Sequence, residues 1–252
     1  EKIEDAITTK TTAILATHCF GNPCAIDAIE IIAKKYNLKV IYDAAHCFGT
    51  TYKNKSVFTY GDISTTSFHA TKLFHSVEGG AVFTNNVTLK KRMSYMRNFG
   101  HNGPEKFHGI GINGKNSEFH AAMGLVNLKY VDEILLSRKK QFHLYKELLN
   151  HNYITFIKTE LNAVQNYSYC PVIFENEEMN LKVIKSLLQN DITPRRYFYP
   201  SLSSLDYVSY YNTPISNDIS KRILCLPLYY DLKKTEIIKI TEIILQTLSG
   251  FY

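Results

Sequence analysis

The chain has 252 residues, and 45% of them are hydrophobic, so it can bury a sizeable core and global disorder is excluded. Its formal net charge of +6 at pH 7 comes from basic pairs and triplets scattered among acidic residues, which is typical of solvated helix faces and argues against a nucleic-acid-binding protein. No apolar run approaches the roughly 20 residues that span a bilayer, and no signal-peptide pattern opens the chain, so we expect a cytoplasmic chain without membrane contact.

The amino-terminal part of the chain alternates between strand and helix patterns. An apolar run at 12–18, followed by Gly21-Asn22-Pro23, predicts a strand and a turn. Residues 27–36 carry apolar side chains at helical spacing, and residues 39–42 predict a second strand that ends at Asp43. Strand, helix and strand over about thirty residues form a βαβ unit, and such units build parallel sheets.

Two further strands, at 62–68 and 80–84, extend this predicted sheet, with Glu78-Gly79-Gly80 as the turn before the second of them. A helix is expected at 88–97. The segment 99–116 that follows is rich in Gly, Asn and His, and it is long enough to be a functional loop rather than a simple connector.

A long helix, straight or bent, is predicted from Ser117 towards Leu149, where it joins two lobes. We therefore expect a large domain at 1–128, a connecting helix at 129–150 and a small C-terminal domain at 151–252. The small domain has the mixed pattern of an α+β lobe. Its predicted strands lie near 153–157 and 167–174, and its predicted helices lie near 179–189, 216–225 and 235–248.

The five cysteines are odd in number and lack C-x-x-C spacing, and a chain of this length needs no disulfide staples. We expect free thiols in a reducing compartment. Because zinc-ligand spacing is absent as well, we expect no metal site.

Chemically active residues gather where the predicted strands end. In open α/β sheets, ligands bind outside the carboxyl ends of the strands. Asp43 ends one predicted strand, while Ser67 and Lys72 follow the next one. Pyridoxal 5′-phosphate needs a carboxylate for its pyridine nitrogen, a hydroxyl for its phosphate, and a lysine whose pKa the surroundings can lower. These residues therefore indicate a pyridoxal-phosphate site in which Lys72 holds the cofactor.

Several motifs occur in an order that matches a known family. The chain resembles the DegT/DnrJ/StrS family of nucleotide-sugar aminotransferases over nearly its whole length. This resemblance implies pyridoxal-phosphate fold type I, as in aspartate aminotransferase: an α/β three-layer sandwich with a mainly parallel sheet, plus a smaller C-terminal α+β domain. The matching segments are His18–Pro23, Asp43–His46 with Gly49, Gly61–Ser64, Ser67–Lys72, Glu78–Ala81, Asn113–Leu125 and Arg195–Pro200.

The resemblance implies a role for each residue around the cofactor. Lys72 carries pyridoxal 5′-phosphate as a Schiff base, and Asp43 pairs with the pyridinium nitrogen. Ala45 lies against the face of the ring. His46 stands near the phenolic oxygen of the cofactor, where many members have glutamine, and Ser67 binds the phosphate.

The resemblance also implies a homodimer with shared active sites, because Asn113 would reach the cofactor phosphate of the neighbouring subunit. Four residues are candidates for the substrate. His75 lies either near the substrate or in a loop where it bonds to backbone, and Glu78 either contacts sugar hydroxyls or shapes its turn. Arg195 and Arg196 either meet a nucleotide diphosphate, whose geometry suits guanidinium, or form a solvated basic pair.

The form Ser-Phe-His-x-x-Lys, together with Glu78-Gly79-Gly80, resembles the branch that aminates C4 of nucleotide-linked 4-keto-6-deoxyhexoses. L-Glutamate is the usual amino donor there, and surface-polysaccharide sugars are the usual products. The branch that acts at C3 more often shows Tyr-Pro-x-Lys and is the alternative. A sugar dehydratase is disfavoured, since such relatives replace the lysine with histidine and this chain has Lys72.

The chain departs from the family pattern in two places. Full-length members carry a segment before the position of Glu1, with a turn that grips the phosphate, so we expect an N-terminally truncated chain. A non-catalytic fragment that acts as an interaction or structural chain is therefore an alternative. In addition, the stretch 200–203 has serine where relatives often place a histidine.

Overall fold

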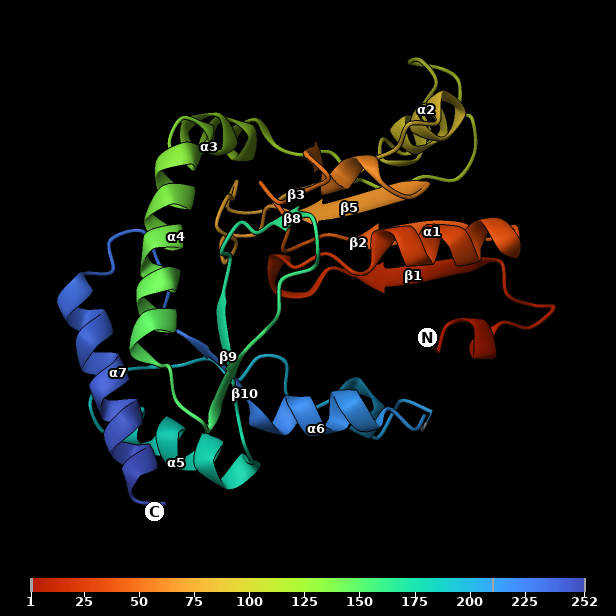
Figure 1. Cartoon of the computed structure of the whole chain (residues 1–252). Coiled ribbons are helices and arrows are strands. Elements are labelled where there is room, and N and C mark those ends of the chain that lie inside the picture. The colour runs from red at the N-terminus through yellow and green to blue at the C-terminus, as the bar shows by residue number, and fades with distance from the viewer. Residues whose placement is uncertain (1, 210, 252) are drawn as a thin grey trace. The chain divides into compact units, whose positions relative to one another are not determined.

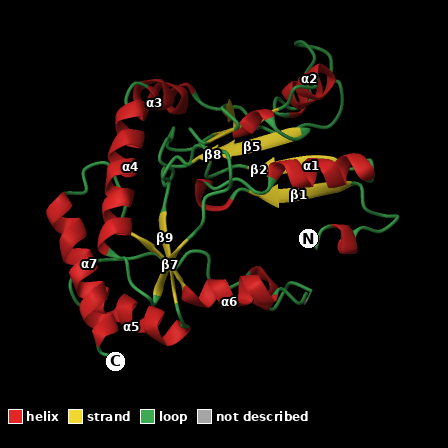
Figure 2. Ribbon diagram, viewed as in Figure 1, coloured by secondary structure: helices red, strands yellow, loops and turns green. Residues whose placement is uncertain are grey.

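The computed structural model describes residues 2–209 and 211–251, which form two compact units (Figure 1, Figure 2). The first unit comprises Glu1–Asp132 and Thr159–Asn166, and the second comprises Glu133–Lys158 and Tyr167–Tyr252. Among the helices of the described residues, none has the length and apolar composition needed to cross a membrane.

A four-stranded sheet forms the centre of the first unit. Its strands β1, β2 and β5 are parallel, and β6 runs antiparallel to β5. The helix α1 (Ile26–Lys35) connects β1 to β2 as the sequence predicts. The predicted α/β class with a mainly parallel sheet is therefore confirmed. In spatial order the strands are β1 (Ala13–Thr17), β2 (Lys39–Asp43), β5 (Ile63–Ser67) and β6 (Gly80–Phe83).

The two faces of this sheet lie in different environments. Val40 and Tyr42 of β2 point to one face, where they belong to a buried core that includes side chains of α1. On the opposite face, Leu15 is 72% exposed and Val82 is 54% exposed. Because side chains alternate along a strand and β1 pairs with β2 in parallel register, Asp43 lies on the same face as Leu15. The last residue of β2 therefore opens onto a face that α1 does not cover.

The rest of the first unit comprises a small sheet and further helices outside the main sheet. Residues 159–166 return to this unit, where β8 (Ala163–Val164) pairs with β3 (Thr51–Tyr52). The sequence pattern does not predict this small sheet, because strands of two residues show no measurable periodicity. The other elements of this unit are η1 (Glu4–Ala6), η2 (Cys19–Gly21), β4 (Lys55–Ser56), η3 (Val57–Thr59), α2 (Val87–Met96) and α3 (Glu118–Leu128).

The helix that the sequence predicts from Ser117 towards Leu149 is two helices, α3 and α4 (Val131–Leu148). Ser117 begins α3 as expected, since its side chain accepts a hydrogen bond from the backbone N–H of His120. Tyr130 N–H donates to the carbonyl oxygen of Asn127, an i to i−3 bond that tightens the last turn and ends α3. Apolar periodicity continues across this break, so the pattern alone does not reveal it.

The second unit packs four helices around a three-stranded antiparallel sheet whose central strand is β9 (Cys170–Phe174). The helix predicted at 216–225 is wrong at its end, because α6 (Pro214–Arg222) stops and β10 (Ile223–Leu226) follows. All four residues of β10 are buried, and a short continuous apolar run cannot be told from buried helix by periodicity. The remaining elements are β7 (Ile154–Phe156), α5 (Glu177–Leu188), η4 (Leu202–Ser204) and α7 (Lys234–Ser249).

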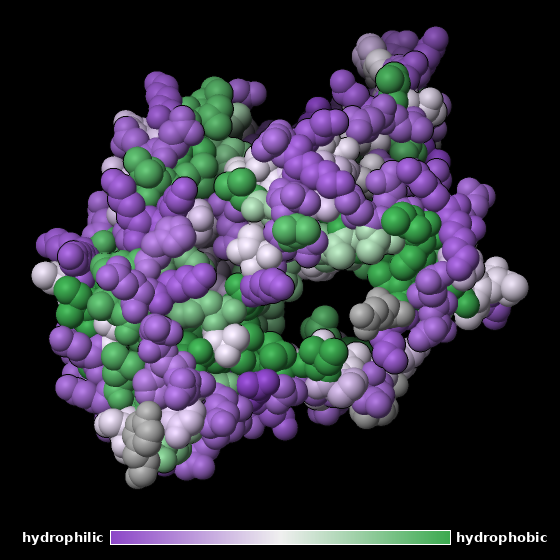
Figure 3. Space-filling view, viewed as in Figure 1, coloured by the Kyte–Doolittle hydropathy of each residue, from purple (hydrophilic) through white to green (hydrophobic). Residues whose placement is uncertain are grey.

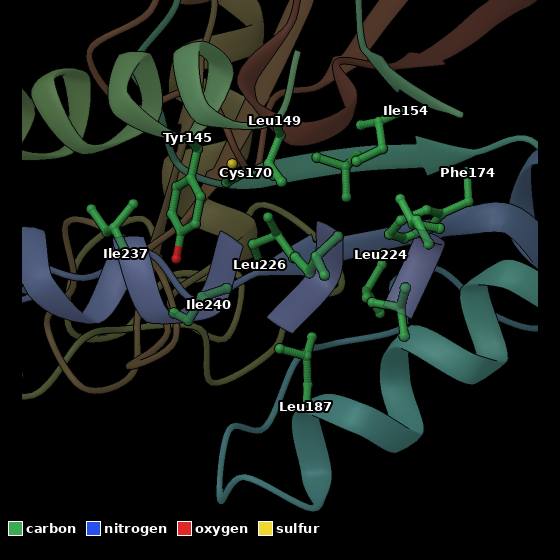
Figure 4. Close-up of a cluster of buried hydrophobic side chains, with 14 of the residues drawn as sticks. Tyr145, Leu149, Ile154, Cys170, Phe174, Leu187, Leu224, Leu226, Ile237 and Ile240 are labelled. Atoms are coloured by element: carbon green, nitrogen blue, oxygen red, sulfur yellow. The ribbon is translucent and has the colours of Figure 1, made fainter. Parts of the chain in front are cut away.

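The core of this unit lies between the sheet, α4, α5 and α7 (Figure 4). Phe174, Leu187, Leu224 and Ile244 are completely buried in it. Tyr145 of α4 is also fully buried, and its hydroxyl donates to the carbonyl oxygen of Pro227 at 3.0 Å. The phenol therefore contributes apolar area without leaving its polar atom unpaired.

One face of α4 carries polar side chains that hold backbone carbonyl groups. The guanidinium of the buried Arg138 donates to the carbonyl oxygens of Tyr167, Leu228 and Ser168 at 3.1, 2.8 and 2.8 Å. One helical turn on, Gln141 donates to the carbonyl oxygens of the same loop, which runs from 227 to 232. Burial lowers the pKa of Arg138 to about 10, so the side chain remains charged at neutral pH.

We expect Arg138→Met to lower the free energy of unfolding by about 3 kcal/mol, because three buried or partly buried carbonyl oxygens lose a charged donor. Urea unfolding followed by circular dichroism measures this loss. Lys139→Met is the matched control, since Lys139 is exposed on the same helix and its replacement should change stability by less than about 0.5 kcal/mol. An equal effect of the two substitutions would contradict the role given to Arg138.

Candidate active site

The turns that follow β1 and β2 interlock at the carboxyl ends of these parallel strands. His18 N–H donates to the carbonyl oxygen of Asp43 at 2.9 Å, which joins the two turns where they begin. Further along, Thr50 Oγ1 donates to the carbonyl oxygen of Gly21 at 3.0 Å. The first turn therefore fixes the second, and Asp43 lies at their junction.

Asp43 is half-buried at the end of β2. Its Oδ1 accepts a hydrogen bond from Ala45 N–H at 3.0 Å, which orients the carboxylate. Within the described residues, no hydrogen bond reaches Oδ2. One oxygen is therefore used for positioning, and the other is available to a protonated nitrogen.

His46 is 6% exposed and is held from two sides. Its Nδ1 accepts a hydrogen bond from Phe20 N–H at 3.1 Å, so the neutral ring carries its proton on Nε2. Asn166 donates through Nδ2 to the carbonyl oxygens of His46 and Phe48 at 2.7 and 2.8 Å. Gly21 is required beside this contact, since a Cβ there would lie 2.2 Å from Asn166 Oδ1. Neither His46 nor its turn can shift without breaking these contacts.

His18 is completely buried beneath the same two turns, and the sequence singled it out only as part of a motif. Its ring stacks on Tyr42 with centroids 4.5 Å apart, and Nδ1 accepts a hydrogen bond from Cys24 N–H at 3.0 Å. Among the described residues, Nε2 has no hydrogen-bond partner. Burial lowers the pKa of His18 to about 4, and the nearby negative charge of Asp43 opposes this shift only in part. His18 is therefore neutral at physiological pH.

Ser67 and Lys72 come from the next strand, β5, and the loop that follows it. Ser67 is the last residue of β5, and its Oγ accepts a hydrogen bond from His69 N–H at 3.3 Å, which leaves the hydroxyl proton for another acceptor. The loop is closed at its ends, because Phe68 N–H donates to the Gly79 carbonyl oxygen and Ser76 N–H donates to that of Phe68. Lys72 is half-buried inside this closed loop.

The remaining predicted residues of the first unit have local partners. His75 Nδ1 accepts from Val77 N–H at 3.3 Å, so this ring has the backbone contact foreseen as one alternative. The side chain of Glu78 is 66% exposed, and its Oε1 lies 3.6 Å from His69 Nε2. Asn113 pairs with Asn98 in an isolated β-bridge at the base of the loop that precedes α3.

The two arginines of the second unit differ in their surroundings. The Arg195 guanidinium lies over the ring of Tyr197, 3.9 Å from its centroid. Arg196 is paired with Glu177, donates to the Lys221 carbonyl oxygen at 3.1 Å, and stacks on an aromatic ring. The Arg196 side chain therefore has structural partners on several sides.

The chain matches the DegT/DnrJ/EryC1/StrS aminotransferase family over residues 1–245 and belongs to that family, as the sequence motifs indicated. It is 40% identical over 240 residues to a dTDP-4-amino-4,6-dideoxy-D-glucose transaminase of Shigella dysenteriae, with 92% of this chain and 65% of that protein covered. The Escherichia coli protein of the same name is 38% identical over 254 residues, with 97% and 68% covered.

Solved structures give the same result. The crystal structure of DesI in the presence of its TDP-sugar product superposes with a TM-score of 0.89 at 27% identity, covering 98% of this chain and 65% of that one. The chain therefore spans about two thirds of the length of the proteins that it matches.

The buried His18 predicts a specific loss of stability in acid. Its pKa is lowered in the folded state, so the unfolded chain binds the proton more tightly, and stability falls as the pH drops from 6.5 towards 4. A difference of about 2.5 pKa units corresponds to about 3 kcal/mol. In His18→Asn, which retains an acceptor for Cys24 N–H, this part of the pH dependence should disappear.

Urea unfolding at a series of pH values between 4 and 7 measures the effect. His108→Asn replaces an exposed histidine of the same unit and should keep the parental pH profile. A His18→Asn profile parallel to that of the parent would show that His18 does not titrate as proposed.

Proposed function

We propose that this chain belongs to a pyridoxal-phosphate-dependent aminotransferase of fold type I that converts a nucleotide-linked 4-keto-6-deoxyhexose into the 4-amino sugar. L-Glutamate is the amino donor, and the products serve surface-polysaccharide biosynthesis. The observation that carries this proposal is the placement of a carboxylate, a hydroxyl and a lysine after neighbouring parallel strands in a member of an aminotransferase family. The five free cysteines fit a reducing cytoplasm.

The donor and acceptor groups fit the cofactor. Asp43 has an oxygen to accept from a pyridinium nitrogen, and Ser67 has a hydroxyl proton to donate to a phosphate. The Nε2–H of His46 suits a phenolic oxygen, and the small side chain of Ala45 leaves space beside an aromatic ring. Lys72 supplies the amine that holds the aldehyde carbon.

When bound, pyridoxal phosphate supplies an electron sink for negative charge at the substrate carbon. Asp43 maintains this property by keeping the pyridine nitrogen protonated. With the cofactor held there, Lys72 Nζ would be the base that takes the proton from Cα of glutamate, and the protonated amine would be the acid for the reverse transfer when the keto sugar is aminated. Ser67 anchors the phosphate so that these transfers take place over a fixed distance.

The substrate assignment rests on the names of relatives. The Shigella and Escherichia relatives are both named for a 4-amino-4,6-dideoxyhexose linked to dTDP, which supports amination at C4. We propose that His75 and Glu78 lie near the sugar. For the diphosphate we favour Arg195 over Arg196, because the latter is already paired with Glu177.

We also propose a homodimer in which Asn113 binds the cofactor phosphate of the partner subunit. The helix α3 supports an interface nearby, since it buries none of its own residues within the described chain although most of them are apolar. Phe119 is 88% exposed and Leu125 is 67% exposed, and apolar side chains reach the surface over this helix (Figure 3). Monomeric proteins rarely leave such a surface open.

Lys72→Ala should lower transamination by at least about 10³-fold and remove the visible absorbance band of lysine-bound pyridoxal phosphate, because no other amine takes over both tasks. Steady-state kinetics with glutamate and a nucleotide-linked keto sugar, together with absorbance titration, measure both losses. Lys55→Ala is the control, since Lys55 is an exposed lysine of the same unit. A chain that develops no absorbance band before any substitution would support the non-catalytic alternative instead.

The shared active site can be tested by mixing two inactive variants. Lys72→Ala and Asn113→Ala each damage one side of the site, so a mixed dimer should contain one intact site and one doubly damaged site. Refolding the two variants together should restore about a quarter of the parental activity, whereas either variant alone should stay inactive. If mixing restores nothing although mixed dimers form, Asn113 does not act across the interface.

A further inference from the structure

Three phenylalanines follow residues of the candidate site within two positions. Phe48 follows His46 by two positions, Phe68 follows Ser67, and Phe74 follows Lys72 by two positions. We call Phe48, Phe68 and Phe74 the phenylalanine cluster. None of them carries a group that reacts.

The three rings contact one another although Phe48 comes from the turn after β2, whereas Phe68 and Phe74 belong to the loop after β5. Phe48 and Phe74 are stacked, with centroids 4.1 Å apart and planes at 12°. Phe68 meets Phe74 edge-on at 5.1 Å and 89°, and it meets Phe48 at 6.0 Å and 80°. Offset stacking and edge-to-face contacts are the arrangements that aromatic rings prefer. The cluster therefore joins the turn after β2 to the loop that carries Lys72.

Phe74 is the only buried side chain between residues 69 and 75, a stretch that the structure describes in full. The hydrogen bonds that close the loop lie at its ends, at Phe68 and Ser76. Between these ends, Lys72 N–H donates to His69 within the loop, which shapes a turn but does not fix it to the sheet. Phe74 is therefore the buried side chain through which this part of the loop packs against the rest of the first unit.

The helix α3 supports Phe74 from another side. A Cβ added at Gly124 would lie 4.0 Å from Phe74 Cζ, so this glycine packs directly against the ring. Asn127, one turn further on, donates through Nδ2 to the carbonyl oxygen of His75 at 2.9 Å. Phe74 is 7% exposed as a result.

We propose that the phenylalanine cluster is the positioning element that sets the Lys72 amine relative to Asp43. The proposal rests on the function proposed above, since it concerns the geometry of that site. Phe74 lies two residues from Lys72, and Phe48 lies on the turn that Asp43 begins, so their stacked rings connect the base to the carboxylate. A displacement of about 1 Å between such groups is enough to slow a proton transfer substantially.

Phe74→Leu tests the proposal, with Phe48→Leu as a second, milder variant because Phe48 is only half-buried. The matched control is Phe58→Leu, since Phe58 and Phe83 form another stacked pair in the same unit, at 4.5 Å and 8°, outside the loop. All three substitutions remove one ring from a stacked pair. Only the first two should affect Lys72.

Two measurements separate positioning from general stability. Hydrogen exchange of the peptide 68–79 in the cofactor-free protein should become about threefold to tenfold faster in Phe74→Leu and Phe48→Leu, and stay at the parental rate in Phe58→Leu. Borohydride trapping of pyridoxal phosphate on Lys72, followed by mass spectrometry, should slow by a similar factor in the first two variants only. The double variant should show less than the product of the single effects, because both rings belong to one stack.

Parental exchange in Phe74→Leu and Phe48→Leu, or equal changes in Phe58→Leu, would overturn the proposal. If Phe74→Leu does not fold, the result for Phe48→Leu decides whether the cluster positions the loop. Failure of the unsubstituted protein to trap pyridoxal phosphate on Lys72 would instead count against the proposed function. The hydrogen-exchange measurement needs no cofactor, so it would still test whether the phenylalanine cluster holds the loop.

Discussion

The parallel register of β1, β2 and β5 is the constraint on which the candidate site depends. Because these strands run in one direction, the residues that follow them emerge at one edge of the sheet, and groups far apart in sequence become neighbours. Asp43 and Ser67 are the last residues of adjacent strands, so their separation is set by the sheet and not by a flexible loop. Of these three residues, Lys72 is the one that belongs to a loop, so the sheet alone does not set its position.

In the turns after β1 and β2, side chains provide the hydrogen bonds that backbone groups would make in a helix or strand. The imidazole nitrogens of His18 and His46 accept backbone N–H groups of the first turn, and the Asn166 amide donates to carbonyl groups of the second. Buried backbone groups that lack a partner are costly, so these side chains complete the hydrogen bonding that strands would otherwise supply.

The sequence predicted the strands of the main sheet and its crossover helix, because short β-forming runs bounded by glycine, proline and aspartate alternate there with a helical apolar pattern. It also makes Asp43, Ser67 and Lys72 candidates for a cofactor site, since they stand at or just after the ends of predicted strands. It missed β10 and the break between α3 and α4, where burial on both sides or continuous periodicity hides the boundary. The phenylalanine cluster was invisible for another reason, because ring contacts between residues 20 and 26 positions apart leave no periodic signal.

The open face of the main sheet links the candidate site to the register of β2. A planar cofactor needs a carboxylate beside its ring and space in front of that carboxylate, and α1 covers only the face opposite to Asp43. On the covered face, Tyr42 and His18 stack in the core, and burial keeps the His18 ring neutral. Consecutive residues of β2 thus point to opposite faces: the Tyr42 side chain packs in the core, and the Asp43 carboxylate lies on the open face. Shifting the register of β2 by one residue would exchange these environments, because it would bury the Asp43 carboxylate and expose the Tyr42 phenol. The chemistry proposed for the site and the stability of the sheet therefore require the same register.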